Sequence, residues 1–443
     1  MMLKKFFWFF PLSLILFVHG FSGNPMTFSS IAQSLSMISG KINVDEYAGN
    51  SNDLSYFNGH YYTGIRPSHS LIYLPSALFV KWISGISFID RGINLMDNLF
   101  VNNPKLPPPR DPGLFIAINF ITVISFIFLV TLIIYKNFSP YMTNRIFLVY
   151  LFTPALALAS GLYIQSFALL GLTFLAVAVI YDNSLFYIYS ACFLGISDYT
   201  WLPLSAMILF LNKKSIRPTL PVIILSTFLI FDGIFHWQVF KSPWLTPYSF
   251  RFSNPAIHGK GFMGLDVLNI FSGFWNRMTS LTEGIIYYNP DVIIFSLISQ
   301  YVVIRSFFSR KAKVIFIITL YWFWFVTLSF VDPVSGIPGN RYVIPLLPLV
   351  ILPVLNFQRQ HIYNLSIVLL MIRGFWNWHV IASAGNVNTA ISGYISTLLR
   401  YPPVFIIAKY WQAGLPNIFL VTILGWFIFI GFVYSLKKYI IRM

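Results

Sequence analysis

The feature that most constrains this chain is a series of continuously apolar stretches that recur from one end to the other. A helix needs about 17–25 apolar residues to cross ~30 Å of hydrocarbon. The candidate stretches are 6–21, 113–135, 145–161, 164–181, 184–196, 199–212, 218–237, 286–307, 313–331, 341–357, 362–382 and 416–436. Transmembrane β-strands alternate apolar and polar residues, and these stretches do not. The sequence therefore predicts an all-α, polytopic helical membrane protein with about twelve transmembrane helices in one domain, residues 1–443.

Composition excludes the soluble classes. Only 9% of the 443 residues are charged, against about 25% in a soluble domain, so polar side chains cannot cover a water-facing exterior. A soluble enzyme, a disordered protein and a nucleic-acid binder are all excluded, although the net charge is +16. The one cysteine, Cys192, lies inside an apolar stretch, so neither an intrachain disulfide nor a thiolate metal site is expected.

The charges of the connecting loops predict the topology. With Lys4 and Lys5 inside, the predicted inner loops and termini hold fifteen basic residues and one acid, Asp182. The first long loop, 22–112, instead balances six basic residues against six acids. Because basic residues accumulate on the cytoplasmic side, we expect a multi-pass protein of the cell membrane with both termini cytoplasmic and with large outer loops at 22–112 and 238–285.

Three segments bear on this topology. Residues 145–181 are too long for one crossing and are expected to fold back near Gly161. Residues 69–89 are apolar enough to cross, but a proline and a lysine interrupt them, so we favour an interfacial position. If 69–89 did cross, 184–212 could form one long span and return the later basic clusters to the inside.

The first outer loop is expected to begin with a short helix. Asn24 is suited to cap it, Pro25 suits its first position, and Gly40 ends it. Its apolar residues fall on one face, with serines and Gln33 opposite; they are Phe28, Ile31, Leu35 and Ile38. This pattern predicts an amphipathic interfacial helix lying on the bilayer.

Acidic residues are scarce, and six of the thirteen lie in this loop, where three cluster: Asp45, Glu46 and Asp53. A carboxylate held at the membrane surface is suited to act as a general base on a hydroxyl group. The alternative is a solvated loop in which aspartates form turns. The residue types alone leave both interpretations open.

A polar and aromatic segment follows these acids. His60 and Arg66 are suited to hold a phosphate or a sugar hydroxyl, and Tyr61 and Tyr62 are suited to stack on a sugar ring. An interfacial aromatic belt, in which tyrosine is enriched, would account for the tyrosines equally well.

The segment Ile31–Pro75, with an aspartate before Gly-His-Tyr-Tyr, resembles the first outer loop of GT-C superfamily glycosyltransferases. It is most similar to the protein-mannosyltransferase-like membrane proteins of bacteria and archaea. Two later segments, Gly284–Pro290 and Gly339–Pro348, resemble that family in the expected order. Thr63–Ser68 departs from the pattern, because it lacks an Asp-Lys pair and the glycine after proline.

The resemblance implies a hexosyltransferase that moves a sugar from a polyprenyl-phosphate donor to a hydroxyl of a glycan, lipid or protein acceptor on the outer face. It implies that Asp53 is the general base, with Asp45 second and Glu46 third. We expect membrane lipid as a partner and no nucleic acid. No cofactor beyond the lipid-linked donor is expected and no metal ligand is assigned, while a divalent metal stays an open alternative.

The leaving lipid phosphate needs a cation, and the arginine fork suits it. Candidates on the outer side are Arg341, which opens a span next to Tyr342, together with Arg277, Lys260, His258 and Arg66. For Arg341 the alternative role is an anchor in the headgroup region.

Ionisable residues within spans are costly and are often functional. Arg373 is expected to neutralise Asp198 or Asp332. Asp232 and His236 share a helical face four residues apart, and we favour a buried polar pair there because two ligands are weak support for a metal.

Two other classes of protein compete with the glycosyltransferase. A transporter or flippase of lipid-linked saccharides would predict inverted repeats and polar residues at the midplane, and no internal duplication is evident. A noncatalytic GT-C-like assembly subunit would keep the fold without the chemistry.

Overall fold

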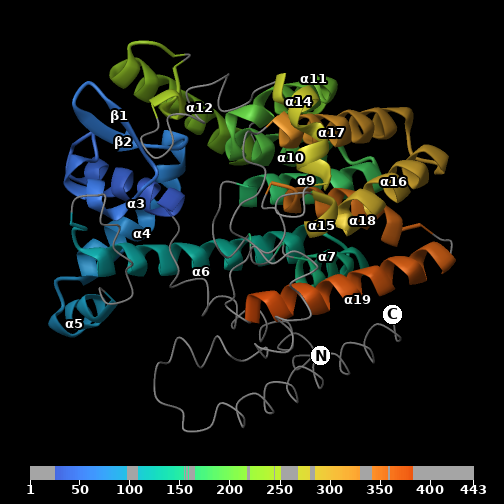
Figure 1. Ribbon diagram of the computed structural model, residues 1–443, viewed down its shortest axis with the longest axis horizontal. Helices are drawn as coiled ribbons and strands as arrows, with labels where there is room; N and C mark the ends of the chain where they lie inside the picture. Colours follow the sequence, from blue (N-terminus) through green and yellow to red (C-terminus); the bar gives the residue numbers. More distant parts are fainter. Residues whose placement is uncertain are drawn as a thin grey trace, which may run out of the picture.

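The computed structural model describes residues 25–96, 108–153, 155, 158, 165–216, 220–243, 245–250, 268–279, 285–329, 342–357 and 360–382. The helices are α3 (Pro25–Ile38), α4 (Ser70–Ile83), α5 (Ser87–Met96), α6 (Pro112–Asn137), α7 (Pro140–Phe152), α9 (Gln165–Tyr181), α10 (Ser184–Ser197), α11 (Leu202–Leu211), α12 (Leu220–Phe240), α14 (Leu268–Thr279), α15 (Ile285–Tyr288), α16 (Pro290–Arg305), α17 (Arg310–Ser329), α18 (Leu347–Leu355) and α19 (Gln360–Ala382). Short 3-10 helices are η1 (Asp45–Asn50), η2 (Pro67–His69), η4 (Tyr199–Trp201), η5 (Lys213–Ser215), η6 (Pro247–Phe250) and η7 (Ile344–Leu346). One hairpin pairs β1 (Leu54–Phe57) with β2 (His60–Thr63). Figure 1 shows α3, α4 and the hairpin at one end of the helical bundle, with α6 running from that end toward α7.

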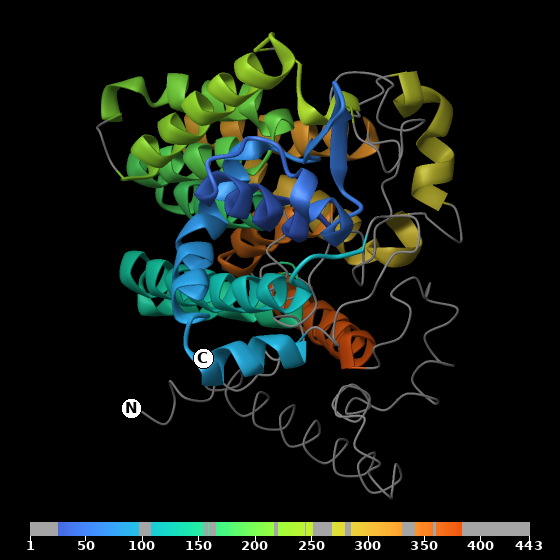
Figure 2. The ribbon, with the colours of Figure 1, turned by 90° about the vertical axis from the view of Figure 1, so that its left-hand side faces the viewer.

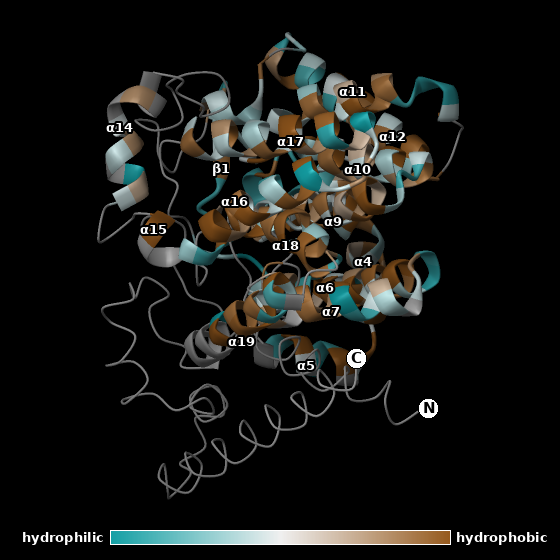
Figure 3. Cartoon of the chain, turned by 90° about the vertical axis from the view of Figure 1, so that its right-hand side faces the viewer, coloured by the Kyte–Doolittle hydropathy of each residue, from teal (hydrophilic) through white to brown (hydrophobic). Residues whose placement is uncertain are grey.

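The predicted helical class is confirmed. Three of the described helices, α6, α12 and α17, are long and apolar enough to cross a membrane, with 26, 21 and 20 residues. Apolar helices α9, α10, α11 and α18 are shorter, and Figure 3 shows that much of their length is coloured as hydrophobic. The predicted spans 6–21 and 416–436 lie outside the described residues, so the number of spans stays a prediction.

The predicted reversal of the chain between 145–161 and 164–181 is confirmed by two hydrogen bonds, while Gly161 itself lies outside the described residues. The hydroxyls of Tyr150 and Thr173 are 2.9 Å apart. Ser166 donates its hydroxyl to the carbonyl of Leu158 at 2.8 Å. The midpoint between the two bonded residues is nearly the same in both pairs, as it is when a chain folds back on itself. Helices α7 and α9 therefore run antiparallel.

Helices α10 and α11 also form an antiparallel pair. The hydroxyl of Ser205 donates to the carbonyl of Ala191 at 2.6 Å, and the chain reverses at Asp198, whose carboxylate accepts the N–H of Thr200 at 3.1 Å. Residues 184–212 are therefore not one long span. With 14 and 10 residues, the two helices are about 21 and 15 Å long, and neither alone covers ~30 Å of hydrocarbon.

Loops predicted to be inside meet at one end of the bundle. The ammonium of Lys311 donates to the side-chain oxygen of Asn212 at 2.6 Å, which joins the start of α17 to the end of α11. Arg145 of α7 likewise bonds Asn356, just after α18. These contacts bring together segments that the charge pattern assigns to the same side.

Segments predicted to be outside meet at the other end. The hydroxyl of Ser55 in β1 donates to the carbonyl of Pro247 at 2.6 Å, and Tyr248 donates to Asp198 at 3.0 Å. The first outer loop, the second outer loop and the reversal between α10 and α11 therefore lie together. These contacts bring together segments that the charge pattern assigns to the other side.

Helix α3 has the predicted bounds but not the predicted surroundings. It begins at Pro25 and ends before Gly40, whose φ of 72° suits only glycine without strain. Phe28 faces α6 as the apolar pattern predicts. The serine face is buried as well, because hydroxyls such as that of Ser34 bond the backbone after the hairpin, here Ser70 at 2.7 Å. The prediction that α3 lies on the bilayer with its polar face in water is wrong.

Helix α4 has 14 residues, about 21 Å, which is shorter than the hydrocarbon layer. Figure 2 shows it leading from the region of the hairpin down to α5. Its outward side exposes large apolar groups, among them Phe79 and Trp82, which is 76% exposed. Its length and exposed apolar side support the interpretation that residues 69–89 lie in the interface.

Candidate functional site

The hairpin of the first outer loop holds the candidate site. Asn58 and Gly59 form its two-residue turn, with φ values of 50° and 85°, and positive φ at both positions is the conformation that tight hairpins require. Phe57 pairs with His60 across the turn. The sequence Asn-Gly therefore fixes His60 as the first residue of the returning strand.

Asp45 is bonded to this strand at two points. Its Oδ2 lies 2.6 Å from Nδ1 of His60, and its Oδ1 accepts the backbone N–H of Tyr61, also at 2.6 Å. The N–H of Val44 donates to the carbonyl of Tyr61 at 2.8 Å, which keeps the start of η1 alongside β2. The side chains of His60 and Asp45 are 50% and 37% exposed, so this pair is both fixed and open to solvent.

Glu46 is engaged in ion pairs. It bonds Lys41 and lies 3.5 Å from the guanidinium of Arg110. The hydrogen bond from Lys41 lowers the pKa of the Glu46 carboxyl below its usual value. A carboxylate held in this way is a weaker base. The ion pairs therefore disfavour Glu46, the third candidate, as the general base.

Asp53 lies beneath the hairpin. Asp53 is only 2% exposed. Its backbone N–H donates to the hydroxyl of Ser51 at 3.0 Å, and its backbone carbonyl accepts the N–H of Gly64 at 3.0 Å. A Cβ on Gly64 would lie 2.3 Å from that carbonyl oxygen, so only glycine allows this approach. Asp53, which ranked first as the base, is therefore enclosed, whereas Asp45 and Glu46 are exposed.

The two tyrosines of the motif have different environments. Tyr61 is half-buried, and its ring centre lies 5.0 Å from that of Tyr56, which is 47% exposed. Tyr62 is buried against Phe235 and Phe240 of α12, and burial raises its pKa. Tyr61 is thus partly accessible, whereas Tyr62 belongs to the core.

Arg66 is an internal residue and not a surface cation. Its guanidinium is fully buried, and its Nε donates to Oδ2 of Asp232 at 2.5 Å. It also donates to the carbonyl of Gly195 and lies 5.0 Å from the ring centre of Tyr199. The prediction that Arg66 contacts a phosphate at the surface is therefore corrected, because the chain turns into the bundle here and pairs the charge with α12.

The residues after Arg66 complete this attachment. Asp232 accepts the N–H of Ser68 at 2.8 Å and its hydroxyl at 3.0 Å. Nε2 of His69 donates to the carbonyl of Ile196 at 2.8 Å. Burial lowers the pKa of His69 to about 4, so the ring is neutral near pH 7. The loop after the hairpin is thus fastened to both α10 and α12.

Asp232 and His236 are both buried, as predicted for a polar pair on one face of α12. They bond different partners, since Nε2 of His236 lies 2.9 Å from the hydroxyl of Tyr199. Among the described residues no group of three or more His, Cys, Asp or Glu is placed to hold a metal ion.

The other residues predicted to bind the sugar donor do not belong to the hairpin. Arg277 of α14 is 7% exposed and donates to the carbonyl of Leu328 near the end of α17, so it is not an open surface cation. Tyr342 is half-buried just before η7. Arg341 lies outside the described residues, and its role stays a prediction.

Arg373 pairs with a residue that the sequence did not indicate. Its Nη1 lies 3.3 Å from the carboxylate of Asp291, and its Nη2 donates to Oδ1 of Asn289 at 2.7 Å. Asp198, one of the two expected partners, instead accepts the hydroxyl of Tyr248, and Asp332 lies outside the described residues. The prediction of Asp198 is wrong, because the reversal of α10 into α11 carries it to the hairpin end.

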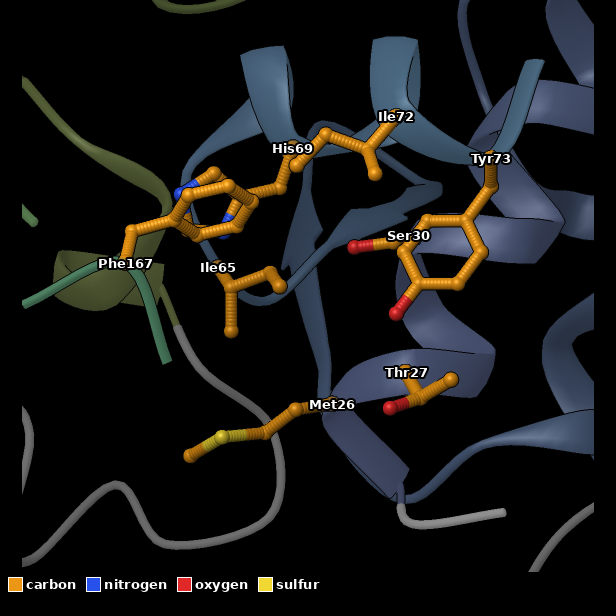
Figure 4. Close-up of a pocket in the computed structure, with 8 residues that line it drawn as sticks. All are labelled: Met26, Thr27, Ser30, Ile65, His69, Ile72, Tyr73 and Phe167. Carbon is orange, nitrogen blue, oxygen red and sulfur yellow. The ribbon is translucent and has the colours of Figure 1, made fainter. Parts of the chain in front are cut away.

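Figure 4 shows a small pocket beside the fastened loop, with a cavity volume of about 10 Å³. It is lined by Met26, Thr27, Ser30, Ile65, His69, Ile72, Tyr73 and Phe167. The ring of His69 lies 5.9 Å from that of Phe167. None of these side chains is charged near pH 7, since His69 is neutral there, so the lining supplies no cation for a phosphate.

Comparisons of the chain with protein-family models, with curated proteins and with solved structures find no match in any of the three. The functional assignment therefore rests on the geometry of the hairpin site, on the two ends of the bundle and on the sequence pattern.

Proposed function

We propose that this chain is a polytopic membrane glycosyltransferase of the GT-C type, protein-mannosyltransferase-like, with about twelve spans. It transfers a sugar from a polyprenyl-phosphate donor to an acceptor hydroxyl on the outer face of the cell membrane. The observation that carries the proposal is the exposed carboxylate of Asp45, held at 2.6 Å by both His60 and the N–H of Tyr61.

This arrangement suits the activation of a hydroxyl. General acid–base catalysis needs a base whose position is fixed before the reaction, within hydrogen-bond reach of the proton. The turn at Asn58 and Gly59 and the bond from Val44 to Tyr61 supply that rigidity. The half-buried ring of Tyr61 beside exposed Tyr56 offers an apolar face next to the polar pair, which suits a sugar ring.

The arrangement of the loops supports a reaction at a membrane surface. The hairpin meets the second outer loop through Ser55 and Pro247, and the basic loops gather at the opposite end, where Lys311 bonds Asn212. The charge difference between the ends orients the basic end toward the cytoplasm. Both termini are then cytoplasmic, and the site faces outward.

A donor phosphate needs a cation near the membrane surface. Arg66 and Arg277 are engaged inside the protein. Arg341, Lys260 and His258 lie outside the described residues, and we assign the lipid phosphate to Arg341 because it opens a predicted span at the outer interface. Its neighbour Tyr342 is half-buried just before η7.

The test uses the full chain in proteoliposomes with tritiated polyprenyl-phosphate mannose, glucose and galactose supplied in turn. Wild-type protein should release or transfer label from one of them. Asp45→Asn should lower turnover by about 10²–10⁴-fold, whereas Asp90→Asn, an exposed aspartate on α5, should not. Asp53→Asn and Glu46→Gln complete the series. Normal transfer by all three acid variants would contradict a catalytic role for this loop.

A further inference from the structure

We propose that the imidazole of His60, and not a carboxylate, takes the proton of the acceptor hydroxyl, and that Asp45 is its positioning residue. This inference rests on the proposed function and assigns the roles within its site.

The hydrogen bond between the two side chains fixes the tautomer of the ring. Nδ1 of His60 lies 2.6 Å from Oδ2 of Asp45, and an ionised carboxylate can only accept. Nδ1 therefore carries the proton, and Nε2 of the neutral ring keeps a lone pair that can accept one. The ring is 50% exposed, so a hydroxyl group can approach it.

The carboxylate is less accessible to a hydroxyl than the ring. Each oxygen of Asp45 already accepts a short bond, one from His60 and one from the N–H of Tyr61, and its side chain is 37% exposed. An aspartate that orients a histidine in this way does the same work as the acid of a catalytic triad.

The pair is held by backbone structure as well as by the side chains. His60 follows the turn at Asn58 and Gly59, where both φ values are positive. Val44, the neighbour of Asp45, donates to the carbonyl of Tyr61 at 2.8 Å. Positioning before the reaction lowers the entropic part of the barrier. His60, whose backbone is held by the turn and whose ring is held by Asp45, is therefore well placed to act as a base.

The step balances without a further reactant. Nε2 of His60 accepts the proton as the acceptor oxygen forms its bond to the anomeric carbon. The bond between that carbon and the phosphate oxygen breaks, and its electron pair leaves with the lipid phosphate. The imidazolium is stabilised beside Asp45 and then gives its proton to water.

The test compares variants of the full chain in proteoliposomes with the tritiated donor on which the wild type acts. His60→Asn keeps an N–H that can donate to Asp45 but removes Nε2. Its kcat should fall by about 10²–10⁴-fold with the KM for the donor unchanged. Imidazole added to the buffer should restore part of the activity of His60→Ala and none to Asp45→Asn. His361→Asn, an exposed histidine of α19, is the matched control and should behave as the wild type.

If His60→Asn keeps the wild-type rate while Asp45→Asn is inactive, the carboxylate is the base. This proposal is then wrong while the glycosyltransferase function stands. If both variants keep the wild-type rate, the pair is not catalytic and the proposal is again overturned. If the wild type acts on none of the three donors, the proposed function fails and this inference fails with it.

Discussion

Arg66 and Asp232 lie 166 positions apart in the chain, and the guanidinium Nε of one donates to the carboxylate Oδ2 of the other at 2.5 Å. The two side chains are 0% and 4% exposed. Two charges removed from water in this way stabilise a protein only as a pair, because either one alone keeps its desolvation cost. The pair fastens the loop after the hairpin to α12 and thereby sets the position of the candidate site over the bundle.

Removing one partner should therefore be costly. We expect Asp232→Asn to lower the free energy of unfolding by about 3–5 kcal/mol, since Arg66 would keep a buried charge. Thermal unfolding in detergent measures this. The double variant Arg66→Met with Asp232→Leu should recover part of the loss, because it leaves no unpaired charge. Equal melting of Asp232→Asn and the wild type would contradict the buried pair.

Gly64 offers a second test of the same region. A Cβ there would lie 2.3 Å from the carbonyl oxygen of Asp53, and backbone cannot yield as a flexible side chain can. Gly64→Ala should destabilise the protein by about 1–3 kcal/mol. Gly92→Ala is the control, because its Cβ would meet no atom within 4 Å and alanine is favoured by about 1 kcal/mol within a helix. Similar melting temperatures for the two variants would refute the close approach.

His69 makes stability depend on pH. Its pKa falls from 6.5 to about 4 on burial, so between these values the unfolded chain binds more protons than the folded one. Its contribution is complete above about pH 6.5 and is lost as the pH falls toward 4, to a total of about 3 kcal/mol. The slope of unfolding free energy against pH should be shallower in His69→Asn over this range. An unchanged slope would exclude His69 as its source.

Cysteine labelling tests the orientation of the bundle. Cys192 is buried, so a Cys192→Ala background is suitable. Asp90→Cys on α5 and Lys214→Cys in η5 replace exposed residues of opposite predicted sides. On intact cells an impermeant thiol reagent should label the first and not the second. Labelling of Lys214→Cys alone would invert the proposed topology.

Much of the helical framework could be predicted because its causes are local. A helix rises about 1.5 Å per residue, so residues 145–181 are too long for one membrane crossing and had to reverse. The bonds from Tyr150 to Thr173 and from Ser166 to Leu158 confirm that reversal. The bounds of α3 follow from Pro25 and Gly40 for the same reason. The Asn58-Gly59 turn was an equally local signal, from which the pairing of Tyr56 with Tyr61 could have been derived, but we did not predict the hairpin.

The environment of the candidate residues was decided by the tertiary structure. Asp53 and Asp45 are both acids of one loop in the sequence, yet folding buries the first against Gly64 and leaves the second exposed beside His60. Nothing in the local pattern distinguishes them. Their difference arises from the way β2 returns between η1 and α12.

By itself the sequence determined the helical class, the ends of several helices and the separation of basic loops from loops of balanced charge, because hydrophobicity, backbone preference and charge act over a few residues. Only the tertiary structure decided that Arg66 is an internal ion pair with Asp232 and that Arg373 pairs with Asp291. A buried charge takes whichever partner the packing brings within about 4 Å, since the desolvation cost must be offset there. That partner can stand anywhere along the chain.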